Sequence, residues 1–256
     1  MAELPKINVI YEDNHLLVVE KPINIPVCED ESRDNDLLNM LKDYIKEKYN
    51  KPGNVFLGLV HRLDRPVGGI MIFAKTSKAA SRLSSQVSNH TFKKTYIAVV
   101  EGKIKKEDTL VDYLYKDTKI NMSYVVDKEK GKESILSYKV LDYKDNYSLV
   151  EINLKTGRSH QIRVQFSSRG YPLVGDAKYN KKHDGKTNVA LFAKKLEFVH
   201  PVTKENLCFE LDIPNRYPFN LFRLTNKDVF YNSTILALCL ILGNNFVNRS
   251  FVFIFK

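Results

Sequence analysis

A series of short apolar runs of strand length, separated by turns, constrains the fold of this chain most. Strands with few helices between them, and without a regular strand–helix–strand alternation, are typical of a mostly antiparallel sheet. The sequence therefore predicts an α+β domain with a mixed, mostly antiparallel central sheet flanked by helices and loops. The clear runs are 7–11, 16–20, 70–74, 95–100, 148–154, 189–198 and 207–211, and weaker ones lie near 122–126 and 134–142.

Helical patterns are confined to three segments, each of which begins next to a residue that can cap it and carries apolar residues on one side. A glycine followed by a proline predicts the end of the third helix, because Gly favours the left-handed position after a helix. The segments are 37–48 after Asp36, 77–88 capped by Thr76 or Ser77, and Ser159 or His160 to Ser168 before Gly170.

Neither an internal repeat nor a low-complexity linker divides the chain, so we expect one domain over residues 1–225. Residues 226–256 differ in composition and form an apolar tail that contains eight consecutive apolar residues at 235–242. A bilayer span needs about 20 apolar residues. A packed helix or an extension unrelated to function is the simpler interpretation, and a membrane-surface or partner-binding segment is the alternative.

The net charge points to a polyanionic partner. Lys and Arg total 40 against 30 Asp and Glu, which gives +10 at pH 7. Nucleic acid or an anionic membrane surface attracts such a chain, although a merely lysine-rich protein has the same charge. The cysteines Cys28, Cys208 and Cys239 lie far apart, which argues against a disulfide framework or a zinc site and fits a reducing cytoplasm.

Nothing in the sequence calls for a cofactor. A Walker loop, a GxGxxG segment and an HExxH segment are all missing, so we expect no nucleotide cofactor and no catalytic metal. The first residues contain neither a basic nor an apolar signal region. We therefore expect a cytoplasmic, monomeric protein without a membrane association.

The segment 60–70 carries the clearest chemical signal. Asp64 lies between Arg62 and Arg65 at the end of an apolar run. Because nearby cations favour the charged form of a carboxylate, we expect Asp64 to be ionised. Such a carboxylate can act as a nucleophile or a base without a metal. The alternative is an Asp that caps a turn or pairs with an arginine for structural reasons.

Three stretches in a fixed order, with a Lys-x-Tyr between the second and third, resemble the RluA-type pseudouridine synthases. The resemblance implies the pseudouridine synthase fold and the isomerisation of specific uridines in rRNA or tRNA without a cofactor. Only six residues precede Ile7, so it implies the catalytic domain without the N-terminal RNA-binding extension of many relatives. The matching stretches are 10–22, His61-Arg62-Leu63-Asp64, and 154–163 with 170–179, and the Lys-x-Tyr is 94–96.

The resemblance implies three catalytic residues. Asp64 attacks C1′ of the uridine or takes a proton from C2′, and the sequence leaves both routes open. Tyr96 stacks on the flipped uracil and helps to move the C5 proton, whereas a strand tyrosine without the resemblance is more often a core residue. Arg163 pairs with Asp64 and orients it. A solvated basic helix face is the alternative for Arg163.

The resemblance also implies a substrate-binding set. Arg62 fills the gap left by the flipped base or holds a phosphate, and Arg158 and His160 lie at or near a phosphate. His61 and Gln161 complete the set, and Lys93, Lys94 and Lys178 add basic surface for RNA. The chain departs from the family pattern at Val67-Gly68-Gly69, where relatives commonly have Thr-Ser-Gly.

Other functions fit the sequence less well. A non-catalytic RNA-binding or ribosome-assembly protein on the same fold is the chief alternative, but binding alone does not need a carboxylate in an anion-binding cleft. A metal-dependent nuclease requires clustered carboxylates, and a glycoside hydrolase requires a carboxylate pair. Neither is evident around Asp64.

Overall fold

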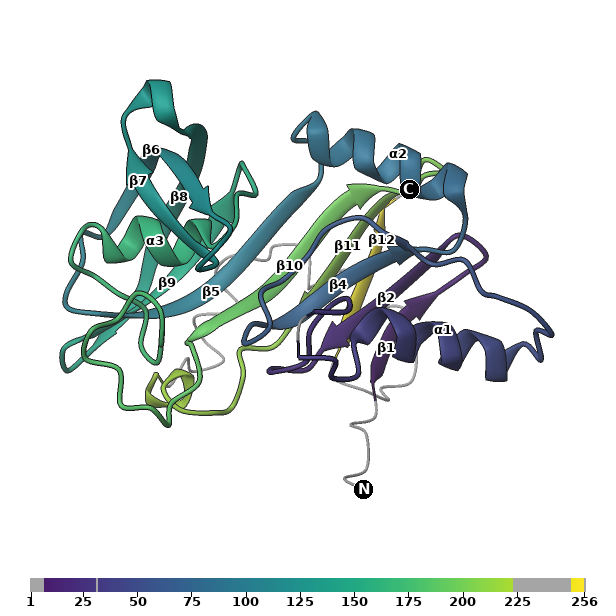
Figure 1. Cartoon of the computed structure of the whole chain (residues 1–256), viewed down its shortest axis with the longest axis horizontal. Coiled ribbons are helices and arrows are strands. Elements are labelled where there is room, and N and C mark those ends of the chain that lie inside the picture. The colour runs from purple at the N-terminus through teal and green to yellow at the C-terminus, as the bar shows by residue number, and fades with distance from the viewer. Residues whose placement is uncertain (1–6, 31, 223–249, 256) are drawn as a thin grey trace, which may run out of the picture.

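The computed structural model describes residues 7–30, 32–222 and 250–255. Its strands form a sheet with the order β1-β2-β4-β10-β5-β9-β8-β6-β7, in which β3 pairs with β4, β11 with β10, and β12 with β11 (Figure 1). They are β1 (Asn8–Glu12), β2 (Leu16–Lys21), β3 (Gly58–Leu59), β4 (Gly68–Ala74), β5 (Lys93–Glu101), β6 (Glu107–Asp117), β7 (Met122–Val126), β8 (Lys132–Lys144), β9 (Tyr147–Leu154), β10 (Leu191–Val199), β11 (Asn206–Leu211) and β12 (Ser250–Phe255).

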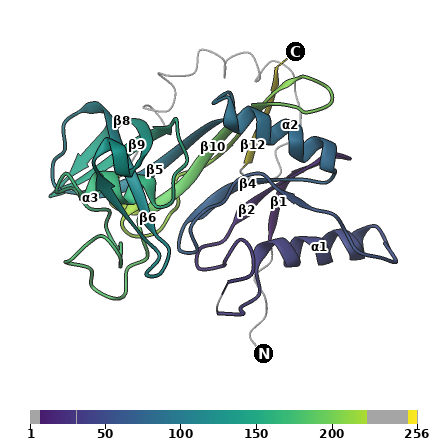
Figure 2. The same ribbon diagram turned by 45° about the horizontal axis from the view of Figure 1, so that its top comes forward.

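The predicted fold class is confirmed, because antiparallel pairing dominates the sheet and helices are few. Between named strands in the described residues, β4 and β10 form the single parallel pair. The long strands β5 and β10 run side by side between the β1–β2 end and the β6–β9 end (Figures 1 and 2). No helix in the described part of the chain is long and apolar enough to cross a membrane.

The first two helices have the predicted bounds. The side chains of Asp36 and Thr76 accept hydrogen bonds from the backbone and cap α1 (Leu37–Lys48) and α2 (Ser77–Ser88). The third helix, α3 (Gln161–Ser167), is shorter than predicted, because His160 before it has a left-handed conformation with a φ of 53°. Two single 3-10 turns lie at Lys128–Lys130 and Phe219–Leu221.

The structure differs from the sequence predictions mainly between residues 103 and 148. The sequence did not predict β6, and the reason is its exposure. Its buried apolar residues, Leu110 and Leu114, lie four positions apart, so the strand lacks the alternation that marks a half-buried strand. Within the predicted tail, residues 250–255 form strand β12 rather than a helix. The rest of the tail lies outside the described residues.

The sheet has an apolar layer on each face. Along β5, Tyr96, Ala98 and Val100 belong to one buried cluster, and Ile97 and Val99 belong to the other. This alternation follows from strand geometry and places Tyr96 on the same face of β5 as Ala98.

A glycine makes the parallel junction of β4 and β10 possible. Gly69, paired with Ala193, has a φ of +120°, a conformation that residues with a Cβ rarely adopt. A Cβ at this position would lie 2.3 Å from the carbonyl oxygen of Ala193. The junction directly follows the loop that carries Asp64, so the close approach of these strands also fixes where that loop ends.

We expect Gly69→Ala to lower the free energy of unfolding by roughly 3 kcal/mol, because it adds a backbone clash to an unfavourable φ. Gly53→Ala is the matched control, since nothing lies within 4 Å of the added Cβ. The control should change stability by less than about 0.5 kcal/mol. Urea unfolding of the variants measures both effects. Equal midpoints for the two variants would contradict the constraint at Gly69.

Candidate active site

The predicted site residues lie together in a cleft of about 950 Å³. Its walls come from the loop at 60–67, from β5, and from the segment that leads from β9 into α3. Segments far apart in the sequence therefore meet here, as the resemblance implied. The predicted residues that line it are His61, Arg62, Asp64, Tyr96, Arg158, His160, Gln161 and Arg163, with Lys94 and Lys178.

A buried lysine fixes the loop that carries Asp64. The ammonium of Lys21, at the end of β2, donates to the carbonyl oxygens of Pro22, Arg65 and Val67 at 2.8–3.0 Å. Burial lowers the pKa of Lys21 to about 7, although the negative charge of Asp64 opposes this shift. The sequence analysis did not assign Lys21 to the site. Its only sequence signal was its place in the first matching stretch.

Arg163 and His160 both approach the same carboxylate oxygen of Asp64. The Nη1 atom of Arg163 donates to Oδ2 at 3.0 Å, and the Nε2 atom of His160 lies 3.8 Å from the same oxygen. The other oxygen, Oδ1, has no hydrogen-bond partner among the described residues. The Asp64 side chain keeps 28% of its surface exposed. Asp64 is therefore held through Oδ2 and presents Oδ1 to the cleft.

The rest of the Arg163 guanidinium is occupied by a second carboxylate. Asp176 is fully buried and accepts from Nε at 2.8 Å and from Nη2 at 2.6 Å. The ring of Tyr179 lies 5.3 Å from the Cζ atom of Arg163. Burial raises the pKa of Asp176, but the hydrogen bonds and charge of Arg163, together with the backbone N–H groups of Lys178 and Tyr179, outweigh burial and hold that pKa below its usual value. Asp176 and Tyr179 lie in a matching stretch, but the sequence analysis gave them no role.

The cation that pairs with Asp64 is neither of the two arginines that flank it in the sequence, Arg62 and Arg65. Arg65 is exposed and pairs with Asp34 and, at 3.6 Å, with Asp30. Arg62 is exposed at the cleft and makes no ion pair with a described residue. The expectation that the flanking arginines stabilise Asp64 was therefore wrong, because Arg163, 99 residues further on, takes that place.

Tyr96 forms a largely buried wall of the cleft. Only 6% of its surface is exposed, and it extends from the same face of β5 as Ala98. Burial raises the pKa of its hydroxyl, and the charge of Asp64 raises it further. The phenol is therefore protonated at neutral pH. Its predicted roles at the uracil stay predictions.

His160 is held by a tyrosine on its far side. Its Nδ1 atom lies 2.7 Å from the Tyr179 hydroxyl, which also accepts a hydrogen bond from the backbone N–H of Ser123. Burial lowers the pKa of His160 to about 4, although Asp64 opposes this shift. A neutral His160 that accepts from Tyr179 carries its proton on Nε2, which faces Asp64.

Other predicted binding residues also make contacts within the protein. The side-chain oxygen of Gln161 accepts from the Thr156 hydroxyl and the Arg158 backbone, and Arg158 Nε donates to the carbonyl oxygen of Glu133. The Nε2 atom of His61 accepts from the backbone of Ile72 at 3.3 Å. These contacts show how the loops are supported. Substrate contacts by these side chains stay predictions.

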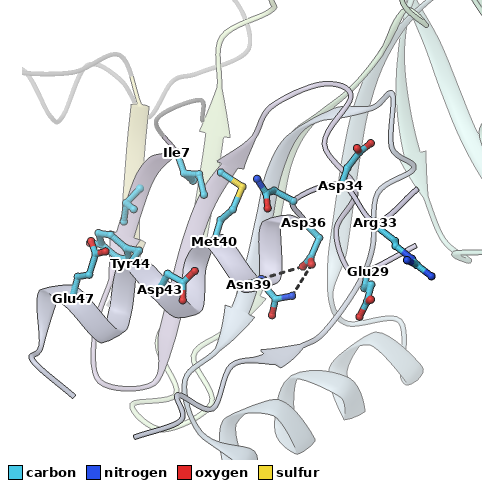
Figure 3. A pocket seen from close by; sticks show the side chains of 12 residues that line it. Ile7, Glu29, Arg33, Asp34, Asp36, Asn39, Met40, Asp43, Tyr44 and Glu47 are labelled. Atoms are coloured by element: carbon cyan, nitrogen blue, oxygen red, sulfur yellow. Dashed lines mark hydrogen bonds between the residues drawn. The ribbon is translucent and has the colours of Figure 1, made fainter. Parts of the chain in front are cut away.

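A second hollow, of about 660 Å³, lies between β1 and α1 (Figure 3). Its apolar side chains include Ile7 and Met40, and carboxylates including Asp43 and Glu47 surround them. Asp36 here accepts hydrogen bonds from Asn39 as the cap of α1. No predicted site residue lines this hollow. Among the described residues, no three His, Cys, Asp or Glu side chains form a group suited to a metal ion.

We expect the His160 imidazole to stay neutral from about pH 8 down to about pH 5, because burial lowers its pKa to about 4 from the usual 6.5. The unfolded chain binds this proton first as the pH falls. The contribution of His160 to the free energy of unfolding should therefore decrease from pH 6.5 toward pH 4. Nitrogen-15 NMR of the histidine rings measures the titration, and His160→Gln should remove this part of the pH dependence. A charged His160 at about pH 6 would contradict the assignment.

Comparisons with known proteins agree on one family. A family model described as RNA pseudouridylate synthase matches residues 15–168. Ribosomal large subunit pseudouridine synthase D of Zymomonas mobilis subsp. mobilis is 30% identical over 237 residues, which cover 87% of this chain and 74% of that protein. A Bacillus subtilis protein named uncharacterized RNA pseudouridine synthase YhcT is 34% identical and covers 84% of this chain and 71% of its own length.

The fold comparison agrees. The structure of human RNA Pseudouridylate Synthase Domain Containing 4 superimposes with a TM-score of 0.69 at 20% identity, covering 84% of this chain and 91% of that chain. This confirms the predicted pseudouridine synthase fold. The chain therefore belongs to the RNA pseudouridylate synthase family, and it is an RNA pseudouridine synthase, an isomerase.

Proposed function

We propose that this enzyme isomerises specific uridines of rRNA or tRNA to pseudouridine, with Asp64 as the catalytic carboxylate and without a cofactor. One observation carries the proposal. Asp64 lies in the cleft with Oδ2 bonded to Arg163 and with Oδ1 unbonded by any described residue. A carboxylate held in this way is oriented by one oxygen and reacts through the other.

The chemistry needs one carboxylate at the sugar. The N1–C1′ bond of uridine breaks, the uracil turns, and a C5–C1′ bond forms while C5 loses its proton. In one route Asp64 attacks C1′ and is displaced when C5 bonds to that carbon. In the other, Asp64 takes the C2′ proton to give a glycal and the proton is later returned. Both routes suit Oδ1, and the proposal leaves them open.

The wall next to Asp64 suits a flipped base. Tyr96 is protonated and largely buried, so its ring can cover a uracil while its hydroxyl serves as a hydrogen-bond donor. Arg62 is exposed and lines the cleft, and we assign it to replace the extracted base in the helix or to bind a phosphate. Proteins commonly recognise RNA through unpaired bases that are splayed out and stacked on aromatic side chains, which agrees with this use of Tyr96.

The names of relatives suggest which RNA to test first. The proteins from Zymomonas mobilis and Nitrosomonas europaea are named for the ribosomal large subunit, so large-subunit rRNA comes before tRNA. The proposal also includes the predicted catalytic domain over residues 1–225, a monomeric state and a cytoplasmic location.

We expect Asp64→Asn to abolish activity, because it keeps the shape of the side chain and removes its charge. The assay is tritium release from C5-labelled uridine in cellular RNA that lacks pseudouridine. Asp43→Asn is the matched control, since Asp43 is exposed on α1 outside the cleft, and it should retain wild-type release. Release by Asp64→Asn would refute the carboxylate assignment. No release by the wild type, with RNA binding intact, would point to a binding protein or to an RNA missing from the assay.

Lys94 should contribute more to RNA binding than its neighbour Lys93. Lys94 lines the cleft and is only 8% exposed, and its ammonium makes no ion pair or hydrogen bond with a described residue. Burial lowers its pKa, which an arriving phosphate would offset. A buried cation without a partner is unfavourable unless a ligand supplies the anion.

The matched variants are Lys94→Gln and Lys93→Gln, both in the Asp64→Asn background so that turnover does not interfere. Lys93 is exposed, and strand alternation directs it to the other face of β5. We expect Lys94→Gln to weaken RNA binding and to reduce the salt slope of log K by about 1. Lys93→Gln should change the RNA affinity and the salt slope less than Lys94→Gln does. Equal effects of the two variants would contradict a specific phosphate contact by Lys94.

A further inference from the structure

The Arg163 guanidinium is divided between two carboxylates in an unequal way. Asp176 takes a two-bond fork through Nε and Nη2, and Asp64 receives a single bond from Nη1. Arginine forms its strongest pairs with carboxylates through two parallel bonds. An Arg163 without Asp176 would therefore be free to turn and bind both oxygens of Asp64, including the oxygen that must react.

We propose that Asp176 is a positioning residue for the reaction, because it fixes the Arg163 guanidinium so that only Oδ2 of Asp64 is bonded and Oδ1 stays free. This inference rests on the proposed role of Asp64. Asp176 is fully buried and does not itself line the cleft, so it acts through Arg163, which does.

The surroundings of Asp176 make this orientation rigid. Its Oδ1 atom also accepts from the backbone N–H groups of Lys178 and Tyr179, at 2.9 Å and 3.1 Å. The segment turns at Gly175, whose φ of +72° and close approach to the Asn188 carbonyl oxygen exclude a larger residue. Asp176 thus has no freedom to follow a moving arginine, and the fork holds Arg163 in one place.

The charges support the same role. Arg163 carries one positive charge between two carboxylates, so the three side chains together carry one negative charge. Asp176 is fully buried, which makes its pairing with Arg163 strong because water does not compete for either group. Asp64 is partly exposed, so its pair with Arg163 is the weaker of the two. A single bond orients Asp64 without engaging its whole carboxylate.

The test is Asp176→Asn. Asparagine keeps an oxygen for the Lys178 and Tyr179 amides, but its NH₂ group faces the Nε–H donor of Arg163 and cannot replace the fork. We expect kcat to fall roughly 10- to 100-fold, with KM for RNA changed by less than about 3-fold, because misplacement of a reacting group acts on the chemical step. An unchanged kcat would overturn the proposal.

Two controls separate positioning from general damage. Asp112→Asn removes another two-bond pair, with Arg169, away from the cleft, and it should leave kcat within about 2-fold of the wild type. The second control is made in an Arg163→Lys background, where no guanidinium remains for Asp176 to orient. Adding Asp176→Asn to Arg163→Lys should lower kcat by less than about 3-fold relative to Arg163→Lys alone. A purely structural role predicts instead that the two losses multiply, and that result would overturn the proposal.

The wild-type protein supplies a measurement that does not depend on a variant that folds. Nitrogen-15 NMR of labelled arginine should show the Nε–H and Nη–H protons of Arg163 as separate signals, with and without bound RNA. A freely rotating Arg163 guanidinium would overturn the proposal. Residual activity of Asp64→Asn would refute the proposed function itself, whereas an inactive Asp64→Asn with a fully active Asp176→Asn would refute this inference alone.

Discussion

The burial of one arginine is the requirement that organises this site. A guanidinium that is 3% exposed needs anionic partners, because an unpaired buried charge is strongly unfavourable. Arg163 finds them in Asp176 and Asp64, which lie on separate loops. The short helix α3 begins directly after His160, which has a left-handed backbone conformation. This sharp start directs the side chains of His160 and Arg163 toward Asp64. Pairing Arg163 correctly thus brings the loop of Asp64 to the segment that runs from α3 to Asp176, although Asp64 and Arg163 lie 99 residues apart in the chain.

Sequence patterns predicted the parts of the fold that follow local rules. Asp36 and Thr76 cap helices whose bounds agree with the prediction, because caps and apolar stripes act within a few residues. Strand β6 escaped prediction, since its buried residues Leu110 and Leu114 are spaced as in a helix and only its pairing with β7 and β8 makes it a strand. The parallel contact at Gly69 has no local signal either, because its partner is Ala193.

The candidate site shows the same limit. The resemblance identified Asp64, Tyr96 and Arg163, and the structure places all three in one cleft. Reasoning from neighbours alone chose Arg62 and Arg65 as the cations at Asp64, and this was wrong because the turn after Asp64 carries Arg65 away toward Asp34. The supports, Lys21 and Asp176, were missed because their roles depend entirely on contacts made across the fold.

The cations around Asp64 and its cleft divide according to whether they have partners within the protein. Lys21 is saturated by three carbonyl oxygens and Arg163 by two carboxylates, and both hold Asp64 in place. Lys94 and Arg62 have no anionic partner among the described residues, so they are available to phosphates. An RNA strand brings many anions that compete for any cation near Asp64. Because its fork is committed to a buried carboxylate, Arg163 can stay with Asp64 and leave phosphates to Lys94 and Arg62.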